Sequence, residues 1–178
     1  MVDGSRKAIF HAHRADDIVT ALRIAEEFGL DAQVVGASEA WLVTDELAAA
    51  EVPVLLGPIM SRSWFEGELR NSNFEAAAIL RDAGVTVGFI GGFEGYVPKV
   101  RLVGFEAAIA AGNGLGMSDA LRAVTLTNAE LLGIDGELGS LDVGKRADIV
   151  LWDGDPFETT SHACAVLVGG EVVSTTCR

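Results

Sequence analysis

Residues 8–29 read AIFHAHRADDIVTALRIAEEFG and contain one complete strand-then-helix unit. The short apolar run Ala8–Phe10 predicts a strand, and apolar residues then recur at helical spacing over Ile18–Phe28. Gly29 stands where this helix should end, because glycine readily adopts the left-handed conformation that follows a helix C-terminus. The stretch therefore predicts one βα unit.

Three further units of the same kind follow. The expected strands are Gln33–Val35, Val52–Leu56 and Thr86–Ile90, and the expected helices are a segment containing Trp41, Leu42 and Leu47, with Ser38 as its N-cap, and a segment from about Asn73 to Ala83. Because βαβ crossovers are right-handed, the four strands should lie parallel in an arc, with the helices on its outer face. The expected fold class is α/β, with about four βα units that make half of a TIM-like (βα)8 barrel, since a full barrel needs about 250 residues.

The pattern changes after the fourth unit. A helix is expected at Val100–Ala111, followed by short helices at Ser118–Val124 and Thr127–Leu132. Thr127 and Glu130 form a capping-box pattern, which predicts that the last helix starts there.

The end of the chain has the pattern of a small β structure. Its expected strands are Asp148–Trp152, Ala165–Val168 and Glu171–Val173, the last two joined by the two-residue turn Gly169-Gly170. We therefore divide the chain into a half-barrel region with C-terminal helices at 1–133 and a small β-rich tail at 134–178.

Composition excludes several classes of partner. The 178 residues include 26 acidic and 13 basic side chains, for a net charge of −13, so the clustered basic surface that nucleic acid requires is not expected. No apolar run reaches the roughly 18 residues that span a bilayer, and Met1–Lys7 has no apolar signal-peptide core. We expect no membrane partner and a cytoplasmic protein.

The two cysteines, Cys164 and Cys177, lack the spacing of metal-binding and redox motifs, so each is expected to be a plain thiol.

His11-Ala12-His13 is the motif with the most chemical promise. It follows a predicted strand at what would be the C-terminal mouth of a barrel, where catalytic groups collect. Residues i and i+2 of a strand share a face, so both imidazoles could reach one metal ion. The alternative is that one or both histidines close the strand end through hydrogen bonds. His162, by contrast, lies among polar residues and is expected to be a solvated loop histidine.

Several segments resemble the C-terminal half of the metal-dependent amidohydrolases, especially the imidazolonepropionase and prolidase-like branch. They are ALRAVTLTNAELLG at 120–133, GSLDVGKRADIVLW at 139–152 and VGGEVV at 168–173. In addition, HAHRADDI at 11–18 resembles the segment after the family's fifth barrel strand, and VLLGP at 54–58 the segment after its seventh.

The resemblance implies a chemistry and also a loss of ligands. In this family a (βα)8 barrel holds one or two divalent metals, usually zinc, for the hydrolysis of C–N bonds, and the terminal strands join N-terminal strands in a β-sandwich. His11 matches one metal histidine, with His13 beside it. Gly36 stands where the family has another metal histidine, and Gly91-Gly92 stand where it has the catalytic aspartate. The family's first-strand His-x-His pair and bridging lysine have no counterpart in the matched half.

These matches define the expected site. We predict no catalytic residue in the chain itself, His11 and His13 as candidate metal ligands, and Glu39 and Glu94 as candidate substrate-binding carboxylates near the mouth. Solvated loop carboxylates are the alternative for both glutamates. No cofactor is expected in the isolated chain, although zinc is typical of the family. Reading His11 and His13 as the family's first-strand pair is disfavoured by the downstream spacing.

Three functional hypotheses remain open at this point. The chain is the C-terminal part of a split amidohydrolase, a non-catalytic relative that self-associates as a binding or structural module, or a truncated product without a role. The expected partner is a second copy or an N-terminal-half amidohydrolase subunit, with a small-molecule ligand also possible. Because the first and fourth strands of a half barrel have open edges, we expect a mainly apolar interface there, larger than roughly 1,600 Å².

Overall fold

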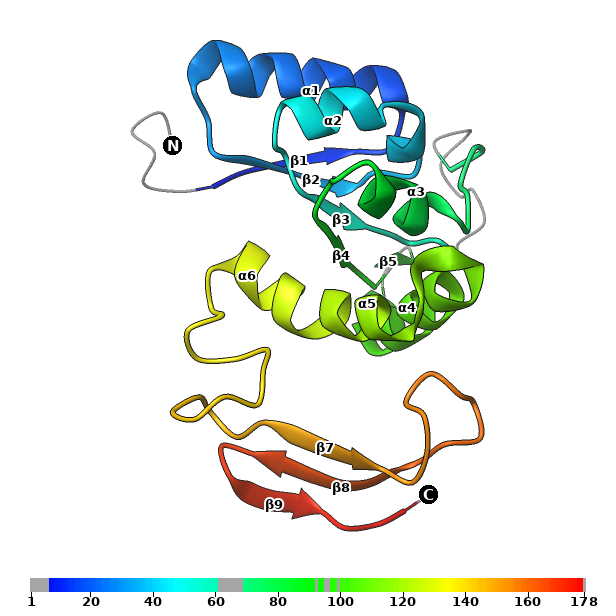
Figure 1. The fold of residues 1–178 in the computed structure, drawn as a ribbon, viewed down its shortest axis with the longest axis vertical. Helices are drawn as coiled ribbons and strands as arrows, with labels where there is room; N and C mark the ends of the chain where they lie inside the picture. The colour runs from blue at the N-terminus through cyan, green and yellow to red at the C-terminus, as the bar shows by residue number, and fades with distance from the viewer. Residues whose placement is uncertain (1–6, 61–68, 92, 95–96, 99, 178) are drawn as a thin grey trace.

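The first half of the chain forms a four-stranded parallel sheet in the computed structural model, which describes residues 7–60, 69–91, 93–94, 97–98 and 100–177. The strands are β1 (Ala8–Ala12), β2 (Ala32–Gly36), β3 (Val54–Leu56) and β4 (Val87–Phe89). They lie side by side in chain order, and each pair is parallel. The prediction of four consecutive parallel strands is confirmed (Figure 1).

Helices follow the first three strands and pack against the sheet. They are α1 (Ala15–Phe28), α2 (Thr44–Ala49) and α3 (Ala76–Asp82). Of the apolar stripe predicted for α1, Ile18, Leu22 and Ala25 are buried, but Phe28 at its end is 53% exposed. Gly29 has a left-handed φ of 59° at the C-terminus, as predicted. The helix predicted after β2 is interrupted, because a 3₁₀ turn at Ala40–Leu42 precedes α2.

The helices cover one face of the parallel sheet, whereas the other face is exposed at β1. On the covered face, Val34 of β2 and Val54 of β3 are completely buried, and they belong to the same core as Leu47 and Leu80 of the helices. The register pairs Ile9 with Gln33, so their side chains share the opposite face, where Ile9 is 62% exposed. The first strand therefore exposes Ile9 on this face, and its outer edge has no neighbouring strand among the described residues, because β1 is first in the sheet order.

Three helices follow β4. They are α4 (Val103–Ala110), preceded by a 3₁₀ turn at Val100–Leu102, α5 (Met117–Arg122) and α6 (Asn128–Leu132). The chain kinks between α4 and α5, where Asn113 and Gly114 have non-helical dihedral angles, whereas a π-helical turn at Ala123–Thr127 joins α5 to α6. The predicted capping box is wrong. Thr127 is buried inside the helix with φ −63° and ψ −42°, and Glu130 pairs with Arg122 at 3.0 Å instead. A buried threonine with helical dihedral angles continues the helix and does not cap it.

The outer edge of β4 is partly closed by α6. The side-chain amide of Asn128 donates to the Phe89 carbonyl oxygen at 2.9 Å, and its oxygen accepts from the Phe89 N–H at 3.0 Å. Asn128 thus takes the place of one residue of a neighbouring strand. The expectation that β4 has a fully open edge is therefore wrong at Phe89.

The tail forms a separate three-stranded antiparallel sheet in the order β7 (Ile149–Trp152), β8 (Ala163–Val168) and β9 (Glu171–Ser174). The predicted turn is confirmed, with φ of 59° at Gly169 and 86° at Gly170. A small hairpin, β5 (Phe93–Glu94) with β6 (Val97–Pro98), was not predicted. The division at residue 133 stays a prediction.

The cysteines correct another expectation. Cys164 lies on β8, and the hairpin returns the chain so that Cys177 comes beside it, where the two form a disulfide. Their separation of 13 residues in sequence conceals this contact, because it depends on the register of the hairpin. The prediction of two plain thiols is wrong for this structure.

Among the described residues, none of the helices has the length and apolar character needed to cross a membrane.

We expect Asn128→Ala to lower the free energy of unfolding by about 1–3 kcal/mol, because the backbone N–H and carbonyl oxygen of Phe89 both lose their hydrogen-bond partner. Urea denaturation followed by circular dichroism measures the loss. The matched control is Asn113→Ala, since Asn113 donates one bond to Ile109 of its own helical segment. Equal losses in the two variants would contradict a special role for Asn128.

Candidate functional site

The loops at the carboxyl ends of β1, β2 and β3 are joined by backbone hydrogen bonds. Ala37 donates to the Ala12 carbonyl oxygen at 2.7 Å, and Gly57 donates to the Gly36 carbonyl oxygen at 3.0 Å. Carboxyl ends of parallel strands are where α/β barrels place their reactive groups. This mouth is therefore the candidate site, and it contains most of the residues predicted from the sequence.

His11 and His13 lie together at the mouth, as predicted. Their ring centroids are 5.1 Å apart and their planes are inclined by 66°. Both histidines line a groove of about 280 Å³ between β1 and α1, with Asp17 and Thr20 on its helical side. The groove opens along the exposed edge of β1. Metal binding by the two imidazoles stays a prediction.

His13 also makes an internal contact that the sequence did not reveal. Its Nδ1 lies 2.8 Å from the hydroxyl of Ser38. Ser38 was expected to cap the helix after β2, but that segment begins with a 3₁₀ turn that has no side-chain cap. The N-cap prediction is wrong, because the hydroxyl is used to hold the imidazole.

Gly36 makes room for the His13 ring. A Cβ atom at position 36 would lie 2.7 Å from Cε1 and 2.9 Å from Nε2 of His13, which is closer than real Cβ contacts. The φ angle of Gly36 is +95°, a conformation that side-chain-bearing residues rarely adopt. At the position where the resemblance places a metal histidine, a side chain would be strained by this backbone conformation, and the His13 ring would have to move to make room for it.

Glu39 is a structural carboxylate in this conformation. Glu39 is only 7% exposed. One of its carboxylate oxygens accepts from the Ala15 N–H at 2.8 Å, and the other accepts from the Asn71 side-chain amide at 2.7 Å. It thus anchors the first turn of α1, where a negative charge is also favoured by the helix dipole. The alternative of a solvated loop carboxylate is wrong for Glu39, and a role in substrate binding stays a prediction.

Two further predicted positions are not fully described. The backbone of Glu94 belongs to β5, but its side chain is not described, so its proposed role in substrate binding stays a prediction. Gly92 lies outside the described residues.

The sequence reasoning missed a second buried carboxylate near the mouth. Glu106 of α4 is 2% exposed and accepts hydrogen bonds from the N–H groups of Ile59 at 2.6 Å and Met60 at 3.3 Å. These bonds hold the chain after β3 against α4. A single glutamate in the otherwise apolar segment VGFEAAIA was the signal that could have identified it.

Charge at the outer rim of the site is balanced locally. Arg14 donates from Nε to Asp16 at 3.0 Å, and this hydrogen bond lowers the pKa of the Asp16 carboxyl below its usual value. Both side chains are largely exposed, so their pairing contributes little to stability.

The described mouth does not assemble a complete set of metal ligands. The described residues contain one group of three or more His, Cys, Asp or Glu side chains that are close enough to share an ion, and it lies in the C-terminal sheet, away from His11 and His13. The two histidines therefore supply at most part of a metal site.

Comparison with known proteins places this geometry in a family. The model of the amidohydrolase family matches residues 68–178, which is more than half of the chain. The chain belongs to the amidohydrolase family. An imidazolonepropionase from Maricaulis maris is 31% identical over 144 residues, covering 80% of this chain and 34% of that protein.

Solved structures agree with this assignment. An amidohydrolase from Thermotoga maritima superposes with a TM-score of 0.88 at 34% identity, covering 98% of this chain and 45% of that one. An adenosine deaminase from Xanthomonas campestris, solved with bound zinc, shares the fold at 19% identity, with a TM-score of 0.66 over 96% of this chain and 46% of its own.

This amidohydrolase chain spans only part of its relatives. It covers 11% and 34% of two curated imidazolonepropionases and less than half of the solved structures named above. Its parallel sheet, C-terminal helices and antiparallel sheet together correspond to one part of an amidohydrolase structure.

We expect Gly36→Ala to destabilise the protein by about 1–3 kcal/mol, because alanine at this φ is strained and its Cβ meets the His13 ring. In a His13→Ala background the loss should be smaller, since the steric part is removed. Urea denaturation of both single variants and the double variant measures this coupling. Gly104→Ala is the control, because a Cβ there meets no atom within 4 Å. Additive losses at positions 36 and 13 would contradict the proposed contact.

We expect Glu39→Ala to lower the free energy of unfolding by about 1–3 kcal/mol, because the Ala15 N–H and the Asn71 amide lose their acceptor. Thermal denaturation measures the effect. Glu46→Ala on α2 is the control, since Glu46 is exposed and its loss should stay within about 0.5 kcal/mol. Unchanged stability in Glu39→Ala would show that these bonds do not hold the mouth together.

Proposed function

We propose that this chain is the C-terminal half of an amidohydrolase-type barrel and takes part in C–N bond hydrolysis only when an N-terminal half completes it. The observation that carries the proposal is the uncovered edge of β1, where Ile9 is 62% exposed and the His11–His13 groove opens. A parallel strand with an open edge and an exposed apolar side chain is suited to pair with another strand.

The chemistry supports a need for a second half. Hydrolysis of this class uses a metal-activated water and a base that moves its proton. In this chain His11 and His13 are the residues that would contribute to holding the metal. Gly36 offers no ligand, and the Glu39 carboxylate already has two protein donors. The remaining ligands and the base would have to come from the other half.

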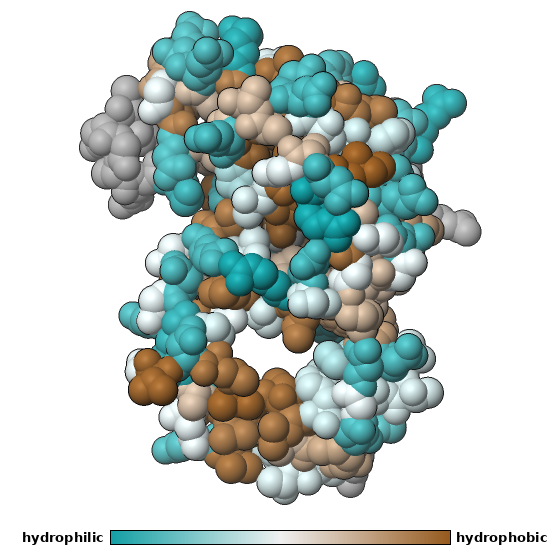
Figure 2. Space-filling model, in the orientation of Figure 1, coloured by the Kyte–Doolittle hydropathy of each residue, from teal (hydrophilic) through white to brown (hydrophobic). Residues whose placement is uncertain are grey.

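The C-terminal sheet offers a second surface for the same partner. Figure 2 shows hydrophobic surface gathered over this sheet. Its exposed residues include Leu151 at 54%, Val172 at 61% and Val173 at 60%. Exposed apolar patches of this kind mark interaction surfaces. By resemblance to the family, the strands that would cover this face belong to the N-terminal part of an amidohydrolase.

Self-association without catalysis is the second candidate. Because Asn128 partly closes the edge of β4, β1 is the edge left for pairing. Two copies related by a two-fold axis could join their β1 strands antiparallel to each other, which is the usual symmetry of a homodimer. In this arrangement the groove beside His11 would become a binding pocket or be filled.

Sedimentation at micromolar concentration tests the interface. We expect the purified chain to associate and Ile9→Lys to weaken the association at least about tenfold, since it places a charge on the β1 edge. Phe28→Lys is the matched control, because Phe28 is 53% exposed and belongs to α1 and not to a strand of the sheet. A well-dispersed monomer that is unaffected by either change would overturn the self-association candidate.

Elemental analysis then separates the two candidates. Under non-reducing conditions, which keep Cys164 and Cys177 paired, the chain alone should retain less than one zinc ion per chain after dialysis. Co-expression with a chain that carries the first four βα units of an amidohydrolase should produce a complex that retains zinc, and His11→Ala should reduce that zinc content. Stoichiometric zinc on the oxidised chain alone, lost in His11→Ala, would contradict the need for a second half.

A further inference from the structure

Four chemically active side chains meet at one end of the C-terminal sheet. Asp153 follows β7, and His162 and Cys164 lie at the start of the central strand β8. The β8–β9 hairpin then carries Cys177 back beside Cys164. None of these residues belongs to the barrel mouth, so the cluster is independent of the proposed function.

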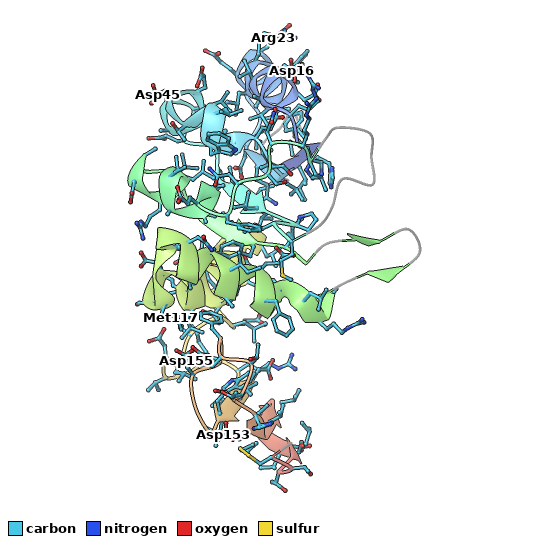
Figure 3. The ribbon with its side chains drawn as sticks, turned by 90° about the vertical axis from the view of Figure 1, so that its right-hand side faces the viewer. Asp16, Arg23, Asp45, Met117, Asp153 and Asp155 are labelled. Carbon is cyan, nitrogen blue, oxygen red and sulfur yellow. A yellow bond between two sulfur atoms is a disulfide. The ribbon has the colours of Figure 1, made fainter. Side chains whose placement is uncertain are left out.

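The geometry brings three possible metal ligands within a small volume. A carboxylate oxygen of Asp153 and the sulfur atoms of Cys164 and Cys177 all lie within 4.8 Å of one another. Figure 3 labels Asp153, with the yellow disulfide bond close to it at the same end of the molecule. In the oxidised chain the two sulfur atoms are bonded to each other, so they must separate on reduction before both can bind one zinc ion with Zn–S bonds of about 2.3 Å.

Asp153 is held in place by two contacts with His162. The His162 backbone N–H donates to Oδ1 at 2.7 Å, and its ring Nδ1 lies 3.1 Å from Oδ2. These hydrogen bonds lower the pKa of the Asp153 carboxyl, first through the backbone donor and then through the ring. His162 is an exposed loop residue before β8, as predicted, with its side chain 46% exposed, and it also bonds to Asp153, a contact that the sequence did not indicate.

We propose that reduction of the Cys164–Cys177 disulfide converts this cluster into a binding site for a thiophilic divalent cation such as zinc. The two sulfur atoms and the Asp153 carboxylate would be its three protein ligands, with water in the fourth position. A site with two thiolate ligands favours zinc, because magnesium and calcium ions bind preferentially to oxygen ligands.

The steps balance with a dithiol as the reductant. The dithiol transfers two electrons and two protons to the S–S bond and itself becomes a disulfide, which leaves two thiols at Cys164 and Cys177. Binding of the divalent cation then displaces the two thiol protons and forms two metal–sulfur bonds. The S–S bond and the metal site use the same sulfur atoms, so the oxidised and metal-bound forms exclude each other.

Cobalt(II) is the probe for this site, because it replaces zinc and gives thiolate-to-metal charge-transfer absorption. The test uses the full chain carrying His11→Ala and His13→Ala, so that the barrel mouth contributes no histidine ligand. After reduction with dithiothreitol and its removal under anaerobic conditions, we expect one cobalt ion per chain with tetrahedral thiolate absorption. The oxidised chain should give none.

Variants assign the ligands. Asp153→Asn should weaken cobalt binding about 10–100-fold, and Cys177→Ser should weaken it at least as much and reduce the charge-transfer absorption. Asp155→Asn is the matched control, since Asp155 lies two residues away and bonds to the Phe157 N–H at 2.9 Å outside the cluster. Its binding should be unchanged, and circular dichroism should confirm that every variant folds.

Three results would overturn the proposal. They are a reduced chain without thiolate absorption, an Asp153→Asn variant that binds cobalt as tightly as its parent, and an oxidised chain that binds cobalt as tightly as the reduced one.

Discussion

The burial of one face of a four-stranded parallel sheet is the constraint on which the rest of the structure depends. The parallel register makes Val34 and Val54 point to the same side, where α1, α2 and α3 bury them. Because side chains alternate along a strand, the other side is fixed by the same register and receives Ile9 and His11. The position of the candidate site and the exposure of the β1 edge both follow from this one arrangement.

Local sequence patterns predicted the parts of the fold that depend on neighbours in the chain. The helix α1 was predictable because its apolar period and its terminal Gly29 agree. The turn at Gly169-Gly170 was predictable because two glycines stand between two strand-like apolar runs. Thr127 failed as a cap because its burial depends on packing against other elements, which a capping pattern does not contain.

Contacts between distant residues were not readable in the same way. The roles of Glu39 and Asn71 depend on a hydrogen bond that spans 32 residues, and the pairing of Cys164 with Cys177 depends on the register of a hairpin. The sequence did place His11 and His13 together, on the expectation that residues two apart on a strand share a face, although β1 ends at Ala12 and His13 follows it. It did not indicate that the His13 ring would lie against Gly36.

The contact between Gly36 and His13 also has an evolutionary consequence. A histidine introduced at position 36 would meet both an unfavourable backbone conformation and the ring of His13. Neither a change at position 36 nor one at position 13 would therefore restore a family-like ligand by itself. Residues in direct contact show such non-additive effects. The effect of a substitution at position 36 therefore depends on which residue is already present at position 13, and the reverse is also true.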